Sequence, residues 1–407
     1  MNNHFINKTF ICLIFLLATS SCSKQNTSDY LYTDENGGIH IEVEKIIDNP
    51  TLKKDGPTLS SLVDSITYIK LGSANAKGEL GLLRNFKKIF FTDNNIIAND
   101  SKTVLLFDNT GNLIRTIGYV GGGPNEYLYS EGTAVDEKNK KIYIGCYNKV
   151  VIYDFDNKFI NSFTYTNQEE FDQITFLKDG MLLLNHPNDY GMLKNKLSLI
   201  DSVGNILKTY PNYYNFTKET ENITVAWGSN VRENFYKNKG VTLYKESYND
   251  TINSFDDAYN LKPYIHLNMG KYTIPIHLRL TYLVDANKIT KLCNDCYNTF
   301  TTETDRYFII ECRPENTENN ALKLIFCDKT NGESLYMEHP IINDIDNGLD
   351  VVPSLISSDG KYIYMTKNAL DFKEEIEKMK NISPALAAFE KTVSEDDNRI
   401  IMKLRLK

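Results

Sequence analysis

The sequence predicts an all-β protein, a six-bladed β-propeller of four-stranded antiparallel blades with a short helical insertion near the C-terminus. Three observations carry this prediction: strand and turn signals that recur after 46 and 47 residues, Asp-Gly turns between apolar runs, and 26 Tyr and 20 Phe against one Trp. Aromatic residues in such numbers favour strands. Four short strands in each stretch of about 40–45 residues are typical of a propeller blade.

The repeat is clearest around three aspartates. Each lies in a segment with an apolar pair, the Asp, a short polar turn and further apolar residues, at 106–117, 152–163 and 199–210. The aspartates are Asp108, Asp154 and Asp201. Because Asp and Asn side chains stabilise turns by bonding to nearby backbone groups, each segment is interpreted as a β-hairpin.

A second kind of hairpin precedes the first in each unit. Asp179-Gly180 and Asp359-Gly360 lie between apolar runs, as a tight hairpin turn requires. The spacing widens in the second half of the chain, which favours six blades over eight. We expect them at residues 80–118, 130–165, 172–212, 222–270, 296–342 and 350–407. A β-sandwich or a division into several domains is the structural alternative.

The first residues indicate export. One basic residue, Lys8, precedes an apolar run over 10–18 that is far shorter than the roughly 20 residues of a membrane-spanning helix. Small residues then lead to Cys22, an order that resembles a bacterial lipobox although Thr19 stands where Leu is usual. We expect a signal peptide over 1–21, a lipidated Cys22, a flexible tether over 22–37 and the propeller over 38–407. The alternative is an ordinary signal peptide in which Cys22 is incidental.

The net charge and the cysteine spacing argue against two classes of ligand, nucleic acids and zinc. The formal net charge of −8 and the lack of a Lys/Arg cluster argue against nucleic acid. Five cysteines remain after Cys22, and Cys293 and Cys296 are the nearest pair. A zinc site would need a second half that the spacing does not supply. A local disulfide and two unpaired thiols both remain open for this pair.

The chain ends must close the ring. The pattern over residues 369–397 predicts helix, with Ser383 as an N-cap and Pro384 in the first turn. A strand over 400–406 then ends the chain. We expect a strand from the other end, over 39–46 or 64–72, to complete this last blade.

The most glycine-rich stretch is RTIGYVGGGPNEYL, residues 115–128. A phosphate-binding loop is disfavoured, because Pro124 lacks a backbone donor, Glu126 repels phosphate and no amphipathic helix follows. We interpret the stretch as the connection between the first two blades. A ligand-facing loop, with Asn125, Glu126 and Tyr127 as the contacts, is the alternative.

The order of lipobox, LSSLVDSITYIKLGS, the glycine-rich stretch, repeated blades and EDDNRIIMKLRLK resembles the six-bladed, NHL-like propeller lipoproteins of Bacteroidota. The resemblance covers nearly the whole mature chain and implies a cell-envelope protein, lipid-anchored at the outer membrane. Asp-Ser/Thr-aliphatic triplets at Ser65, Ser202 and Thr251 also look like O-glycosylation acceptors of these bacteria.

We therefore expect a binding module for a glycan, a peptide or an envelope protein, built as a monomeric propeller without a cofactor. The runner-up is a metal-dependent propeller hydrolase or lyase with its site in the central channel. The histidines after Cys22 are dispersed and form no metal-binding motif, and no Gly-x-Ser-x-Gly elbow occurs, so the sequence favours binding over catalysis and assigns no metal ligand.

Overall fold

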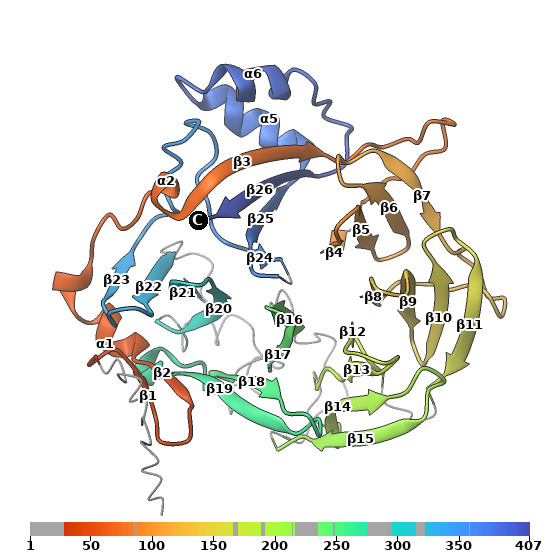
Figure 1. Cartoon of the computed structure of the whole chain (residues 1–407), viewed down its shortest axis with the longest axis horizontal. Helices are drawn as coiled ribbons and strands as arrows, with labels where there is room; N and C mark the ends of the chain where they lie inside the picture. Colours follow the sequence, from red (N-terminus) through yellow and green to blue (C-terminus); the bar gives the residue numbers. More distant parts are fainter. Residues whose placement is uncertain are drawn as a thin grey trace, which may run out of the picture.

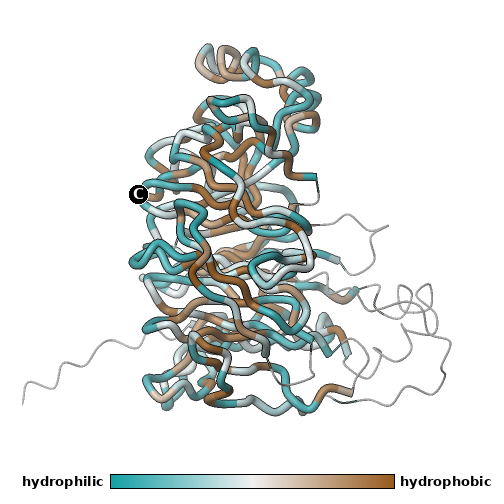
Figure 2. Tube along the Cα trace, turned by 90° about the vertical axis from the view of Figure 1, so that its right-hand side faces the viewer, coloured by the Kyte–Doolittle hydropathy of each residue, from teal (hydrophilic) through white to brown (hydrophobic). Residues whose placement is uncertain are grey.

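The computed structural model describes residues 28–84, 86–165, 170–188, 192–213, 215, 235–246, 249–275, 293, 295–314, 322–357 and 359–407. In these ranges the chain forms six sheets, each with an antiparallel four-stranded blade, arranged as a ring (Figure 1). The predicted fold class is therefore confirmed. Seen from the side, hydrophobic stretches run through the interior of the disc and hydrophilic turns lie toward its faces (Figure 2).

Each blade runs from an inner strand near the ring axis to an outer strand at the rim. Blade 1 holds β4 (Phe86–Phe91), β5 (Asn95–Asp100), β6 (Val104–Asp108) and β7 (Leu113–Ile117). Blade 2 holds β8 (Gly132–Asp136), β9 (Lys141–Cys146), β10 (Lys149–Asp154) and β11 (Phe159–Thr164). Blade 3 holds β12 (Gln173–Phe176), β13 (Leu182–Asn185), β14 (Asn195–Ile200) and β15 (Ile206–Pro211).

The second half of the ring repeats the same order. Blade 4 holds β16 (Phe235–Asn238), β17 (Val241–Lys245), β18 (Thr251–Phe255) and β19 (Leu261–Leu267). Blade 5 holds β20 (Tyr297–Glu303), β21 (Tyr307–Pro314), β22 (Lys323–Asp328) and β23 (Ser334–Met337). Blade 6 holds β24 (Leu355–Ile356), β25 (Tyr362–Lys367), β26 (Ile400–Leu406) and β3 (Val63–Lys70). A 3₁₀ turn, η2 (Gly270–Tyr272), follows blade 4.

The aspartate repeat marks the turn between the third and fourth strands of blades 1 to 4. Oδ1 of Asp108 accepts hydrogen bonds from the backbone N–H groups of Thr110 and Asn112, both at 2.9 Å. The same pattern recurs at Asp154, Asp201 and Asp256. The residue three positions after each Asp has a positive φ, at Gly111, Asn157, Gly204 and Tyr259. The fourth copy is weaker in the sequence, because Tyr259 occupies the left-handed position where Gly or Asn is expected.

The ring closes between the two ends of the chain. β26 lies between β25 and β3, and β3 pairs antiparallel with it from Ile400↔Lys70 to Leu406↔Val63. Of the two closing strands expected from the sequence, residues 64–72 are therefore confirmed and residues 39–46 are wrong. β2 (Ile39–Ile41) pairs instead in parallel with β19, the outer strand of blade 4, and covers the edge of that strand.

A segment before β3 runs around the outside of blades 4, 5 and 6, and we call residues 31–62 the belt. It consists of β1 (Leu31–Thr33) and β2, then α1 (Val43–Ile47), η1 (Pro50–Leu52) and α2 (Leu59–Leu62). Lys54 N donates to the Tyr336 carbonyl of blade 5 at 3.0 Å, and Leu59 N donates to Ile342 O at 2.9 Å. The belt begins inside the stretch expected to be a flexible tether, so residues 31–33 are ordered as a strand.

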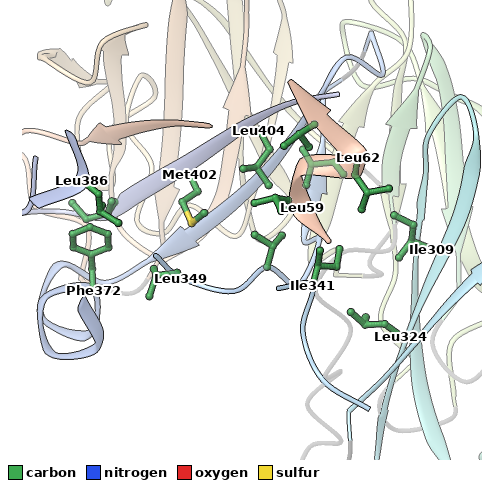
Figure 3. Close-up of a cluster of buried hydrophobic side chains, with 14 of the residues drawn as sticks. Leu59, Leu62, Ile309, Leu324, Ile341, Leu349, Phe372, Leu386, Met402 and Leu404 are labelled. Carbon is green, nitrogen blue, oxygen red and sulfur yellow. The ribbon is translucent and has the colours of Figure 1, made fainter. Parts of the chain in front are cut away.

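The helical segment packs on the outer side of blade 6. It forms α5 (Ala369–Lys378) and α6 (Pro384–Glu390), and Ser383 Oγ accepts from Leu386 N at 3.2 Å, which confirms the predicted cap. Figure 3 shows Phe372 and Leu386 close to Met402 and Leu349, at one end of a core cluster that extends past Leu59 and Leu404 to Ile309 of blade 5. The helices thus bury the outer face of the closing blade.

Candidate functional site

The inner strands enclose the main candidate site, a cavity of about 390 Å³ on the ring axis. All six inner strands contribute side chains to its wall, and we call this cavity the channel. Each inner strand is the last strand of its sheet, so one edge of every inner strand faces the axis (Figure 1). An unpaired strand edge carries backbone hydrogen-bond donors and acceptors. The ring places six such edges around the channel.

Aromatic and aliphatic side chains form much of the channel wall. Phe90, Phe176 and Phe300 come from β4, β12 and β20, which belong to alternate blades 1, 3 and 5. Val135 and Leu355 add aliphatic surface from blades 2 and 6. Apolar walls with a few placed polar groups are typical of small-molecule sites.

Lysines are the charged groups that stand out in this wall. Lys88 of β4 and Lys237 of β16 lie on blades 1 and 4, which face each other across the ring. Lys88 Nζ is 5.1 Å from the centroid of the Phe90 ring, and Lys237 Nζ is 5.9 Å from that of Phe176. Burial lowers the pKa of the Lys237 ammonium below its ordinary value, and the charge of Lys88 lowers it further.

Two further lysines line the channel nearer its ends. Lys245 is the last residue of β17, and burial lowers its pKa as well. Lys138 lies in the exposed turn after β8. Among the described residues the channel wall therefore holds four lysines.

The acids of the channel wall come from blade 2 alone among the described residues. Asp136 Oδ2 accepts from Asn139 Nδ2 at 2.7 Å, a bond within the turn after β8. Glu137 Oε1 accepts from the backbone N–H of Asp93 at 2.7 Å and so ties the turns of blades 1 and 2 together. Both carboxylates hold turns, and the four lysines outnumber them.

Three residues of the wall, Tyr236, Thr299 and Thr301, have hydroxyl groups without a hydrogen-bond partner among the described residues. Thr299 and Thr301 lie two apart on β20 and both line the channel, and their Oγ1 atoms are buried without a hydrogen-bond partner in the described part of the chain. Thr299 is only 4% exposed. A buried hydroxyl without a partner costs about 1–3 kcal/mol, so a ligand that bonded here would recover some of that energy.

The glycine-rich stretch connects β7 of blade 1 to β8 of blade 2, as predicted. Glu126 Oε2 accepts from Gly123 N at 2.8 Å, and Lys149 Nζ donates to the carbonyl oxygens of both residues. The bond between Glu126 and Gly123 lies within the loop, and the two bonds from Lys149 fasten the loop to β10 of blade 2.

The three loop residues that were expected to contact a ligand have different environments in the structure. Tyr127 is 1% exposed and its hydroxyl donates to Ile117 O at 2.9 Å, so it belongs to the core and its expected ligand role is wrong. The reason is that Gly118 has no Cβ, which leaves room for the ring of Tyr127 against its backbone. Asn125 is exposed and Glu126 half-buried, and their ligand role stays a prediction.

A buried serine and histidine in blade 3 have the contacts of a nucleophile and its base. His186 Nε2 lies 2.8 Å from Ser198 Oγ, and the hydroxyl of Tyr165 lies 2.7 Å from the same oxygen. Ser198 is completely buried and His186 is 2% exposed. The group therefore fastens the end of β11 to β13 and β14 instead of meeting a substrate.

The remaining predicted residues lie apart from the channel. Ser65 on β3 and Ser202 in the β14–β15 turn are exposed, and Thr251 Oγ1 is 3.0 Å from His266 Nδ1. Glycosylation at these three positions stays a prediction.

Cys293 and Cys296 are buried. Cys296 Sγ donates to Thr273 O at 3.3 Å, and a disulfide between the two cysteines stays a prediction. Cys22 lies outside the described residues.

The described residues bring together no group of three or more His, Cys, Asp and Glu side chains that could hold a metal ion. They also contain no helix that is long and apolar enough to span a bilayer.

Comparisons with known proteins agree with the propeller. A crystal structure of a protein from Bacteroides fragilis NCTC 9343, described as a candidate exported protein, matches with a TM-score of 0.68 and 18% identity over 87% of this chain and 98% of that one. A member of the DUF4221 family from Bacteroides vulgatus ATCC 8482 matches with a TM-score of 0.49 and 13% identity over 85% of this chain and 98% of that one.

At its level of identity the first likeness shows the fold alone. A search of the curated proteins finds no match to this chain. A family model for a domain of unknown function, DUF4934, matches residues 38–405, and the chain therefore belongs to that family.

Proposed function

We propose that this protein is an exported, lipid-anchored binding module of the cell envelope whose ligand enters the channel. The observation that carries the proposal is the cavity of about 390 Å³ walled by all six inner strands. Its volume lies within the range of small-molecule sites, about 300–1,000 Å³. The ligand is a small molecule or the end of a glycan or peptide that fits this space.

The lining supports binding better than catalysis. The enzyme alternative, a metal-dependent hydrolase or lyase, would use acids and histidines that converge from several blades. The described wall instead offers phenylalanine faces, lysines and free hydroxyls, and its Asp136 and Glu137 carboxylates are engaged in turns. Aromatic faces and placed donors can recognise a ligand without a reacting group.

Export and anchoring rest on the sequence and on one likeness. The apolar run over 10–18 followed by Cys22 supports a lipoprotein signal, and the similar Bacteroides fragilis protein is described as a candidate exported protein. An outer-membrane location, on either leaflet, belongs to the same proposal.

Replacing Cys22 tests the anchor. We expect wild-type protein to sediment with membranes and to incorporate labelled palmitate, and the Cys22→Ala variant to lose both properties, because the acylated thiol is gone. Cys12→Ala is the matched control, since Cys12 lies in the apolar run and would leave with the signal peptide. A Cys22→Ala protein that still carries the label would contradict the anchor.

A ligand screen with two variants tests the channel. Thermal denaturation of the mature protein is measured with panels of glycans, peptides and organic acids, because a ligand at about 100 times its Kd stabilises the native state by about 2.7 kcal/mol. The Thr301→Trp variant should lose the shift, since the indole fills the channel and Thr301 gives up no hydrogen bond.

Asn125→Ala is the matched control on the glycine-rich loop, and it should keep the shift. The melting curve of each variant without ligand shows that it is folded. If Asn125→Ala abolishes ligand binding and Thr301→Trp does not, the site is the loop and the channel proposal is overturned.

A further inference from the structure

One side of the channel, between blades 4 and 5, holds hydroxyl groups that lack hydrogen-bond partners. Tyr236 lies on β16, the inner strand of blade 4, and Thr299 and Thr301 lie on β20, the inner strand of blade 5. All three residues line the channel, and their hydroxyl oxygens are buried and unbonded within the described part of the chain. We call these three residues the polar seam.

The polar seam is built from facing surfaces of the two blades. Tyr236 packs against a hydrophobic cluster that blades 4 and 5 share, and burial and the charge of Glu303 on β20 raise its pKa. Because successive side chains of a strand alternate between its faces, Thr299 and Thr301 share the face of Tyr297, which belongs to the same cluster. The three hydroxyls therefore belong to one inter-blade space that opens on the channel.

Hydroxyl groups without partners are unusual in the interior of a protein. Most buried polar atoms are bonded, and each exception calls for an explanation such as a bound water or a functional contact. Three exceptions from two adjacent inner strands, all at one cavity, are explained together by a single occupant. Rotation about χ1 exchanges the hydroxyl and methyl groups of a threonine, so Thr299 and Thr301 can present Oγ1 to the channel without a backbone change.

The charges beside the polar seam already face opposite charges. Each Glu303 carboxylate oxygen accepts from the Tyr264 hydroxyl at 3.0 Å, and Oε1 also pairs with Lys329 Nζ at 2.6 Å. Burial lowers the pKa of Lys245 at the end of β17, and the charge of Asp250 raises it. The seam therefore lacks hydrogen bonds more than it lacks a counter-charge.

The chemistry of the wall matches a sugar. The hydroxyl groups of Thr and Tyr both donate and accept hydrogen bonds, and another hydroxyl group matches them in both roles. A pyranose has a rim of hydroxyl groups around apolar C–H faces. The channel offers the same combination, because Phe90, Phe176 and Val135 give it apolar surface beside the seam hydroxyls.

We infer that the channel binds the terminal sugar of a glycan, a neutral pyranose whose hydroxyl groups bond to Tyr236, Thr299 and Thr301. This inference rests on the proposed function, because it names the ligand class of the same channel. None of the three residues was singled out from the sequence.

The first test compares sugars with a six-membered ring that lacks most of their hydroxyl groups. Binding of the methyl glycosides of glucose, galactose, mannose and N-acetylglucosamine, and of cyclohexylmethanol, to the mature protein is measured by isothermal titration calorimetry. Calorimetry is used because concentrated sugars stabilise proteins without binding at a site. We expect at least one glycoside to bind about tenfold more tightly than cyclohexylmethanol. If none does, the inference is overturned.

Variants that each delete one hydroxyl group locate the site. Tyr236→Phe, Thr299→Val and Thr301→Val should each weaken binding of that glycoside about fivefold to tenfold, because each loses one hydrogen bond to the sugar. The melting temperature of the free protein should not fall, since these hydroxyls make no bond within the described part of the chain. A residue with a purely structural role would not combine weaker binding with undiminished stability. Unchanged affinity in all three variants would refute the role of the seam.

Two further variants are the matched controls. Tyr264→Phe removes a hydroxyl that lies between the same blades, is bonded to Glu303 and does not line the channel. It should lower the melting temperature and leave the affinity unchanged. Thr302→Val changes the threonine on the opposite face of β20 and should leave the affinity unchanged.

Two results of these controls would contradict the inference. If the three seam variants lower the melting temperature as much as Tyr264→Phe does, the seam hydroxyls hold internal water and not a ligand. If Thr302→Val weakens binding as much as Thr301→Val does, the sugar does not distinguish the seam from the rest of the channel wall.

The outcomes also separate this inference from the proposed function. If no glycoside binds, but a peptide or an organic acid from the screen binds and Thr301→Trp abolishes that binding, the channel is a site for another class of ligand. If the ligands found in the screen bind elsewhere, both proposals fail together.

Discussion

Deletion of residues 399–407 is expected to abolish cooperative unfolding. The deletion removes β26, which lies between β25 and β3 and is the strand through which β3 joins blade 6. It also removes Ile400, Ile401, Met402 and Leu404, all at most 2% exposed. At about 1.5–3 kcal/mol for each buried side chain, the loss approaches the whole stability of a typical domain, about 5–15 kcal/mol.

The measurement is thermal or urea denaturation followed by circular dichroism and by near-ultraviolet signals from buried tyrosines. Arg405→Ala is the control on the same strand, because Arg405 is exposed and its truncation should change stability by less than about 0.5 kcal/mol. A truncated protein with an unchanged melting transition would show that β26 is not needed to close the ring.

Gly118→Ala is expected to destabilise the protein by about 2–4 kcal/mol. Gly118 has φ +74°, where a residue with a Cβ is strained, and a Cβ there would lie 2.6 Å from Tyr127 Cε1 and 2.8 Å from Tyr153 Cε2. Both rings are 1% exposed and cannot move without disturbing the core between blades 1 and 2. The free energy of unfolding is obtained from urea denaturation.

Gly122→Ala is the matched control in the same loop. A Cβ at Gly122 would meet nothing within 4 Å, and its φ lies outside the left-handed region. We expect its free energy of unfolding to stay within about 0.5 kcal/mol of wild type. Similar losses in both variants would mean that the loop acts through backbone flexibility instead of the contact between Gly118 and the tyrosines.

The sequence was most informative where structure depends on neighbouring residues. The turns at Asp108, Asp154 and Asp201 are built from bonds within four residues, and such bonds leave a repeat that can be aligned. The cap at Ser383 is local in the same way. From these features the repeated blades and the helical insertion could be predicted.

Long-range contacts left weaker signals. β2 meets β19 more than 220 residues later in the chain, and nothing in the three residues of β2 specifies that partner over β26. Tyr127 is similar, because its burial depends on the ring of Tyr153 and on the conformation of Gly118. An aromatic residue after a glycine-rich turn is compatible with either an exposed or a buried side chain.

The candidate site was the least predictable part. Lys88 lies in FKKIFF and Lys237 in FYKN, where a lysine looks like the polar residue of an ordinary strand. Their shared place follows only when the ring brings blades 1 and 4 to opposite sides of one channel. Once the four strands of each blade are assigned, a lysine in an innermost strand indicates a channel residue. This pattern could have identified Lys88 and Lys237.

The pairing of β3 with β26 also sets an order for folding. The two strands are more than 320 residues apart, so their contact is among the last that a growing or emerging chain can form. Until residue 406 is available, β3 has no sheet partner, while blades 1 to 5 can assemble from strands that are close in sequence. We therefore expect completion of the ring to be a late step of folding, and a chain interrupted before its last strand to remain an open arc that is sensitive to proteases.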